Sequence, residues 1–190
     1  MTITIESIKD QIPYYLTQNA KEYLVKSLND FPKVNYYLNR YEDEILQGDG
    51  WDTLKLFDFK SGEKKAVKGI ILSNSCDISS ENKRAIPANI SFAPIIRLDN
   101  YIKILKESGL DEKTIEARIR SVKSQQTTNR FYLPKGGNLE YEFIAILDDL
   151  YTVPLEHFST KTEKTKIFTL SQIGFLSISH EDFYSFLPIS

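Results

Sequence analysis

The chain of 190 residues contains one cysteine and two histidines, Cys76, His157 and His180. A single cysteine cannot form a disulfide within the chain, and this predicts a reducing, cytoplasmic compartment. One cysteine and two histidines are also too few for a typical structural zinc site. We therefore expect no bound metal and no cofactor, although the count leaves carboxylate-rich metal sites open.

Long apolar runs and an excess of one charge are also missing. No run approaches the roughly 20 apolar residues that span a bilayer, and the N-terminus lacks the basic start and apolar block of a signal peptide. We expect no membrane partner. The net charge is -2, so no global basic field attracts nucleic acid. A local basic patch remains open.

What the chain does have is ample core-forming material, with 41% hydrophobic and 12% aromatic residues. Its periodicity predicts a single domain of residues 1–190 with an α+β fold, a small, curved, mostly antiparallel sheet or SH3-like barrel decorated with helices. We expect a helical N-terminal segment (1–44), a β core (45–98 and 130–178), a helical insertion (99–124) and a C-terminal helix (180–188). Strands are predicted at 53–59, 66–73, 90–96, 130–133, 141–147, 151–153 and 166–170.

The helical segments have local signals of their own. Within the insertion, Gly109 is expected to end a first helix and Asp111 to cap the next. In the N-terminal segment, apolar residues recur at three- and four-residue spacing. The favoured interpretation is an amphipathic cap on the main domain, and the alternative is a docking arm for a partner protein.

The most informative run is Gly69–Asp77, where an apolar strand leads into small polar residues. If the strand persists, Ser73, Ser75 and Asp77 share one face, which favours a binding surface. Cys76 would face the other way, as a nucleophile or, more in keeping with a lone cysteine, a buried small hydrophobe. Asp77 could bind a cation or orient a water, but a turn-capping role is favoured.

A second polar cluster, Lys123–Arg130, is bracketed by cations and precedes two aromatic residues. It could grip the phosphates of a single-stranded nucleic acid, although a solvated linker from helix to strand is the favoured interpretation.

Asp77 follows a strand that is expected to be buried, and an unpaired carboxylate near a core costs free energy. We therefore expect Arg130 to be the cation that approaches Asp77.

The strand block resembles the MazF/PemK growth-inhibitor family, small barrels of bacterial toxin–antitoxin pairs, over about half of the chain. The resemblance implies a MazF-like barrel. It is carried by Gly48-Asp49, the strand ending at Phe59, the Ser61–Glu63 loop, Val67–Ser73, Ala93-Pro94, Phe143–Val153 and the segment from His180 to Leu187.

The chain departs from that family at both catalytic positions. The family's ribonucleases have Arg-Pro where this chain has Lys68-Gly69, and a threonine after the third-strand proline where this chain has Ile95-Ile96. The leading hypothesis is therefore a non-catalytic binding or regulatory protein of a toxin–antitoxin or phage-defence system, with a protein partner. The alternative is a divergent endoribonuclease acting on single-stranded RNA, with Lys68, Asp77 and Arg130 as candidate catalytic residues.

Overall fold

The computed structural model describes residues 36–38, 42, 44–58, 61–79, 81–159, 164–171 and 174. The predicted C-terminal helix and most of the predicted N-terminal helical segment lie outside these residues. The helical prediction is wrong at Tyr37 and Leu38, which form a short strand because they pair with another strand of the sheet. The chain forms two compact units, residues 1–36 with 170–190, and residues 37–169. In the first, the Ser171 backbone N–H donates to the Tyr36 carbonyl at 3.0 Å. The second holds the sheet and its helices. The organisation of 1–190 as a single domain stays a prediction.

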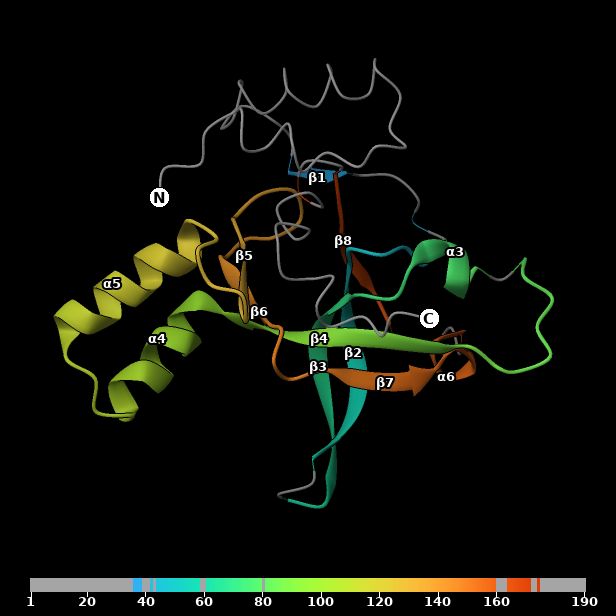
Figure 1. Cartoon of the computed structure of the whole chain (residues 1–190), viewed down its shortest axis with the longest axis horizontal. Helices are drawn as coiled ribbons and strands as arrows, with labels where there is room; N and C mark the ends of the chain where they lie inside the picture. The colour runs from blue at the N-terminus through green and yellow to red at the C-terminus, as the bar shows by residue number, and fades with distance from the viewer. Residues whose placement is uncertain are drawn as a thin grey trace, which may run out of the picture. The chain divides into compact units, whose positions relative to one another are not determined.

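An open eight-stranded sheet forms the framework (Figure 1), with the strand order β1-β8-β2-β3-β4-β6-β5 and with β7 also paired to β4. Each pairing with a defined register is antiparallel. The α+β class is confirmed, and the sheet is open rather than closed into a barrel. The strands are β1 (Tyr37–Leu38), β2 (Asp49–Asp58), β3 (Glu63–Ile71), β4 (Asn89–Arg97), β5 (Arg130–Leu133), β6 (Phe143–Ile146), β7 (Tyr151–Pro154) and β8 (Lys166–Leu170).

The β2–β3 hairpin differs most from its sequence-based prediction. β3 begins at Glu63 rather than at Ala66, because cross-strand pairing continues to Asp58↔Glu63 at the turn. β2 begins at Asp49, four residues before the predicted start. In Figure 1 its outer half extends beyond the neighbouring strands. A bulge lies between Trp51 and Leu54, and Thr53 there has a φ of 57°, a conformation that costs a β-branched residue free energy.

Gly69 explains how β3 fits beside its neighbours. A Cβ at this position would lie 2.8 Å from side-chain atoms of both Leu54 and Phe92. The absence of a side chain therefore lets the strand approach the core closely. This steric requirement accounts for the glycine in the Lys68-Gly69 pair noted above.

Four helices accompany the sheet within the described residues: α3 (Ser75–Ile78), α4 (Leu98–Glu107), α5 (Glu112–Lys123) and α6 (Leu155–Ser159). Both signals in the helical insertion are confirmed. Gly109, with a φ of 82°, follows α4, and the Asp111 side chain accepts from the Thr114 backbone N–H at the start of α5. None of the helices in the described part of the chain is long and apolar enough to cross a membrane.

The buried side chains form two apolar clusters. The first lies where β2, β3 and β4 meet α3 and α6, and comprises Leu54, Ile71, Ile78, Ile90, Phe92 and Phe158. The second joins the two helices of the insertion to β6, and comprises Leu98, Tyr101, Leu105, Ile115, Val122 and Ile144. The α4–α5 pair is therefore anchored to the sheet by its own core.

Asp49, at the start of β2, is a fully buried carboxylate. It accepts hydrogen bonds from the Leu46 backbone N–H at 2.7 Å and the Thr169 hydroxyl at 2.8 Å. The Lys166 ammonium lies 2.8 Å from its second oxygen and is itself largely buried. Burial raises the pKa of Asp49 from its ordinary 3.8, and the bond from Lys166 opposes that rise. The Asp49 carboxylate thus connects the turn before β2 to β8, where Thr169 lies 120 residues further along the chain.

We expect Asp49→Ala to lower the free energy of unfolding by about 3–5 kcal/mol, because it leaves the Lys166 ammonium buried without its counter-ion. Chemical denaturation of the wild type and the variant measures the difference. Replacing both partners, Asp49→Ala with Lys166→Met, should cost less than the sum of the two single changes. Additive effects would contradict the coupling.

Candidate functional site

The strand-end cluster does not form the shared face that the sequence predicted. β3 ends at Ile71, and Asn74 then caps α3 by accepting from the Cys76 backbone N–H at 2.9 Å. The alternation expected of a persisting strand is therefore lost. Ser73 and Ser75 instead accept from backbone groups, the N–H of Ser91 at 2.7 Å and the N–H of Gln47 at 2.8 Å. Their hydroxyls fasten this turn to β4 and to the segment before β2.

Cys76 and Asp77 lie on the exposed side of α3. The expectation of a buried Cys76 is wrong, because the helical turn points it to solvent. The expected pairing of Arg130 with Asp77 is also wrong. Arg130 pairs with Asp148, and the Asp77 backbone carbonyl accepts from Arg84. The described interactions therefore do not gather Lys68, Asp77 and Arg130 into one constellation, and a binding role for the strand-end residues stays a prediction.

In the second polar cluster, Lys123–Arg130, side chains form hydrogen bonds to nearby backbone groups. The Gln125 side chain bonds both backbone groups of Tyr132, donating to its carbonyl at 2.8 Å and accepting from its N–H at 3.1 Å. Thr127 donates to the Arg130 carbonyl at 3.1 Å. Lys123 pairs with Glu142 at 2.7 Å. The donors that were candidates for phosphate binding thus shape the connection from α5 to β5, which favours the linker.

Lys68 has a defined partner at the β2 bulge. Its ammonium pairs with the Asp52 carboxylate, and both side chains are more than a third exposed. Asp52 also accepts from the Thr53 backbone N–H at 2.7 Å. Although burial acts to raise it, the pKa of Asp52 is lowered from its ordinary 3.8 by the bonds from Lys68 and Thr53. Asp52 is therefore a carboxylate at neutral pH.

Lys68 belongs to a row of lysines on one face of the β2–β3 hairpin. Side chains alternate across a strand, and Phe57 lies opposite Lys64 in the register, as Lys55 lies opposite Ala66. Lys55, Phe57, Lys64 and Lys68 therefore share a face, which we call the lysine face. Phe57 is 45% exposed. The other face of the hairpin carries the Lys65–Asp58 ion pair.

Another lysine, Lys164, lies near the hairpin but outside the lysine face. Lys164 and Thr165 directly precede β8. The Thr165 carbonyl accepts a hydrogen bond from the Asp52 backbone N–H at 2.9 Å, which holds this segment beside β2. Burial, and secondly the charge of Lys55, lower the pKa of Lys164 from its ordinary 10.5. The Lys164 ammonium lies 4.7 Å from the centroid of the Phe158 ring, and Phe158 belongs to the apolar cluster that contains Leu54. Leu54 and Lys55 are neighbours in β2 and point to opposite faces, so Lys164 lies on the core side of the sheet.

Sequence reasoning missed most of the lysine face. It identified Lys68 but left Lys64 outside the strand, because that strand was expected to begin at Ala66. The signal was present, since Lys64, Ala66 and Lys68 are spaced by two. It becomes visible only once the hairpin register pairs Lys64 with Phe57.

The described residues contain no group of three or more His, Cys, Asp or Glu side chains placed to hold a metal ion. No protein-family model matches the chain, and no curated protein matches it either. The resemblance to the MazF/PemK family stays a prediction.

We expect the carboxyl of Asp52 to titrate below pH 3.8 in the wild type, and Lys68→Ala to move its midpoint upward by removing a bond to the charged form. The contribution of the pair to stability is present above that ordinary value and fades as the pH falls through the lowered pKa. Carboxyl NMR titration measures the midpoint. Lys65→Ala, on the opposite face, is the matched control and should leave it unchanged. An unmoved midpoint in Lys68→Ala would contradict the assigned pair.

Proposed function

We propose that the protein binds single-stranded RNA on the lysine face and does not cut it. One observation carries this proposal. Lys55, Lys64 and Lys68 share one face of a hairpin with the exposed ring of Phe57, and Asp52 is the carboxylate paired there. Proteins that grip single strands combine cations that track the backbone with aromatic rings that stack on bases.

The dimensions of the face suit an extended strand. Lys64 and Lys68 are separated by four residues, or about 13 Å along β3. Phe57 lies beside Lys64 in the register, so a base stacked on the ring would bring its phosphate close to that ammonium. Paired bases have no free face for such stacking, which favours a single strand over a duplex. The choice of RNA over DNA rests on the family resemblance.

Binding without cleavage is favoured by the state of Asp52. Metal-independent RNA cleavage needs a base, an acid and cationic stabilisation of the phosphate. A carboxylate whose pKa is lowered by its ion pair with Lys68 is a weak base. The other two candidate catalytic residues lie elsewhere. Asp77 is exposed on α3, and Arg130 on β5 pairs with Asp148.

The second candidate function is a divergent endoribonuclease, and one observation favours it. The Asp52–Lys68 pair lies next to Thr53, whose positive φ is a costly conformation. Strained backbone of this kind is concentrated at active sites. For this second function, the candidate catalytic residues are Lys68 and Asp52, and Asp77 and Arg130 no longer belong to the set.

A regulatory role in a toxin–antitoxin or phage-defence system, with a protein partner, remains part of the proposal. It is supported by the toxin-like strand order together with the missing arginine and threonine. The genes next to this one provide the direct check, because a paired gene would name the system.

Fluorescence anisotropy with a labelled single-stranded RNA tests the lysine face. We expect the Lys55→Ala/Lys64→Ala variant to bind more weakly and to reduce the slope of log K against log salt concentration by about 1.4, because about 0.7 is lost for each phosphate contact on a single strand. Phe57→Ala should weaken binding by about 1–3 kcal/mol through lost stacking. Single-stranded DNA and duplex RNA of the same sequence are run in parallel.

Lys65→Ala is the matched control, since it removes the same charge from the opposite face of the same hairpin and should leave the salt slope almost unchanged. The single variant Lys64→Ala is measured beside it. Equal losses in Lys65→Ala and Lys64→Ala would show that binding follows overall charge and would contradict the lysine face. The same RNA is then examined for cleavage with and without Mg²⁺. Cleavage that is abolished by Lys68→Ala or Asp52→Asn would establish the endoribonuclease instead.

A further inference from the structure

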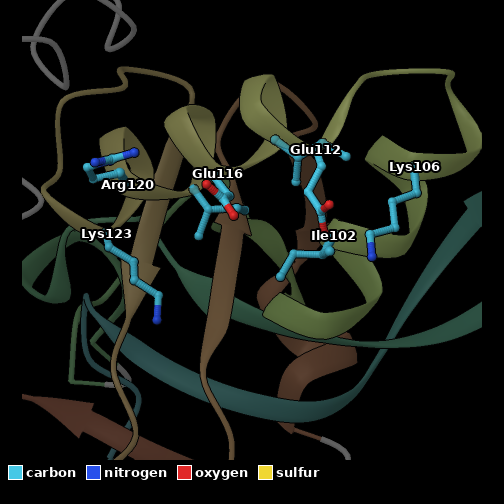
Figure 2. A pocket seen from close by; sticks show the side chains of 8 residues that line it. Ile102, Lys106, Glu112, Glu116, Arg120 and Lys123 are labelled. Carbon is cyan, nitrogen blue, oxygen red and sulfur yellow. The ribbon is translucent and has the colours of Figure 1, made fainter.

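A shallow groove of about 480 Å³ lies along the α4–α5 pair, away from the hairpin that carries the lysine face. Its apolar lining comes from Ile102 on α4 and from Ile115 and Ile119 on α5. Its charged lining is Lys106, Glu112, Glu116, Arg120 and Lys123. Figure 2 shows Glu112 and Glu116 toward one part of the groove and Arg120 with Lys123 at its other end.

Most of these charges have no counter-ion within the described chain. Glu116 and Arg120 are four residues apart on one helix, the spacing at which ion pairs form. The structure nevertheless places neither of them, nor Glu112, in an ion pair. Lys123 is the exception, with two hydrogen bonds to Glu142. The groove therefore presents both signs of charge to whatever covers it.

The charges are sorted along α5. The positions that face the groove include Glu112, Glu116, Ile119 and Lys123, spaced by four, three and four residues, which places them on one side of a helix. The acidic residues occupy the first half of this stripe and the basic residues the second half, and Ile119 lies between the halves. Two copies of this stripe are complementary when they pack antiparallel, because the basic half of each copy then lies against the acidic half of the other.

We propose that the α4–α5 groove binds a second copy of this chain through antiparallel packing of α5 on α5. A two-fold axis at the level midway between Glu116 and Arg120 places Glu116 of each copy opposite Arg120 of the other. Glu112 then lies near Lys123 of the second copy, whose ammonium has a donor left beyond its bonds to Glu142. The two Ile119 side chains meet close to the axis.

The size of the surface sets the strength of this dimer. Stable interfaces bury about 800 Å² on each partner, and α5, with 12 residues, is only about 18 Å long. Ile102 and Lys106 of α4 must therefore also be covered, which gives an arrangement of four helices. An interface at the low end of the size range predicts a weak dimer, with a dissociation constant in the micromolar range.

Charge reversal at the central pair tests the proposal. Sedimentation equilibrium of the full chain from about 1 µM to about 500 µM should show a monomer–dimer equilibrium. Glu116→Arg, and separately Arg120→Glu, should each raise the dissociation constant at least about tenfold, because each places two like-charge contacts in the interface. Combining both changes in one chain restores opposite charges across the axis and should restore dimerisation. Mixing the two single variants should likewise give a heterodimer.

Arg118→Glu is the matched control, since it makes the same charge change on α5 outside the groove lining and should leave the dissociation constant unchanged. Circular dichroism confirms that each variant keeps its helices. A wild type that is monomeric throughout, or a dimer that neither single reversal weakens, would overturn the proposal. A doubly reversed chain that stays monomeric would do so as well. RNA affinity measured on monomeric Glu116→Arg keeps this outcome separate from the proposed function.

Discussion

The sheet depends on one buried carboxylate. Asp49 is removed from solvent at the start of β2, and a carboxylate in that position is costly unless charges and donors surround it. Lys166 and Thr169 supply that environment from β8, and the backbone of Leu46 supplies it from the preceding turn. β8 must therefore lie against β2, and this contact fixes the neighbour on one side of the hairpin while β4 pairs with the other.

With its base held between β8 and β4, the hairpin presents its outer half to solvent (Figure 1). The bulge at Thr53 and the glycine at position 69 adjust the inner half to the core. The outer half is left with an exposed face that carries cations and a ring. The α4–α5 pair has its own apolar core with β6 and presents a groove of mixed charge. The protein thus offers two chemically distinct surfaces on separate elements, one suited to a polyanion and one suited to a helix with an acidic half and a basic half.

The elements were largely predictable, because their signals are local. Alternation predicted β5 and β8 to the residue, and Gly109 with Asp111 marked the break between α4 and α5. The strand-end cluster was misjudged because a strand was assumed to continue beyond Ile71, where Asn74 instead caps a helix. Arg130 was expected to meet Asp77, but the β5–β6 pairing brings it to Asp148 on the turn after β6. Partners of this kind depend on register, which no local pattern in this sequence specifies.

Local signals were sufficient to predict the α+β composition, the position of the helical insertion and the strand that carries Lys68, since propensity, periodicity and capping act over a few residues. Whether the sheet closes, and which side chains share a surface, depends on contacts that appear only in the folded chain. The lysine face exists because cross-strand register sets Phe57 opposite Lys64. The groove exists because α4 and α5 pack side by side on β6. Both are contacts between residues distant along the chain, and their geometry is set by pairing and packing rather than by local preference.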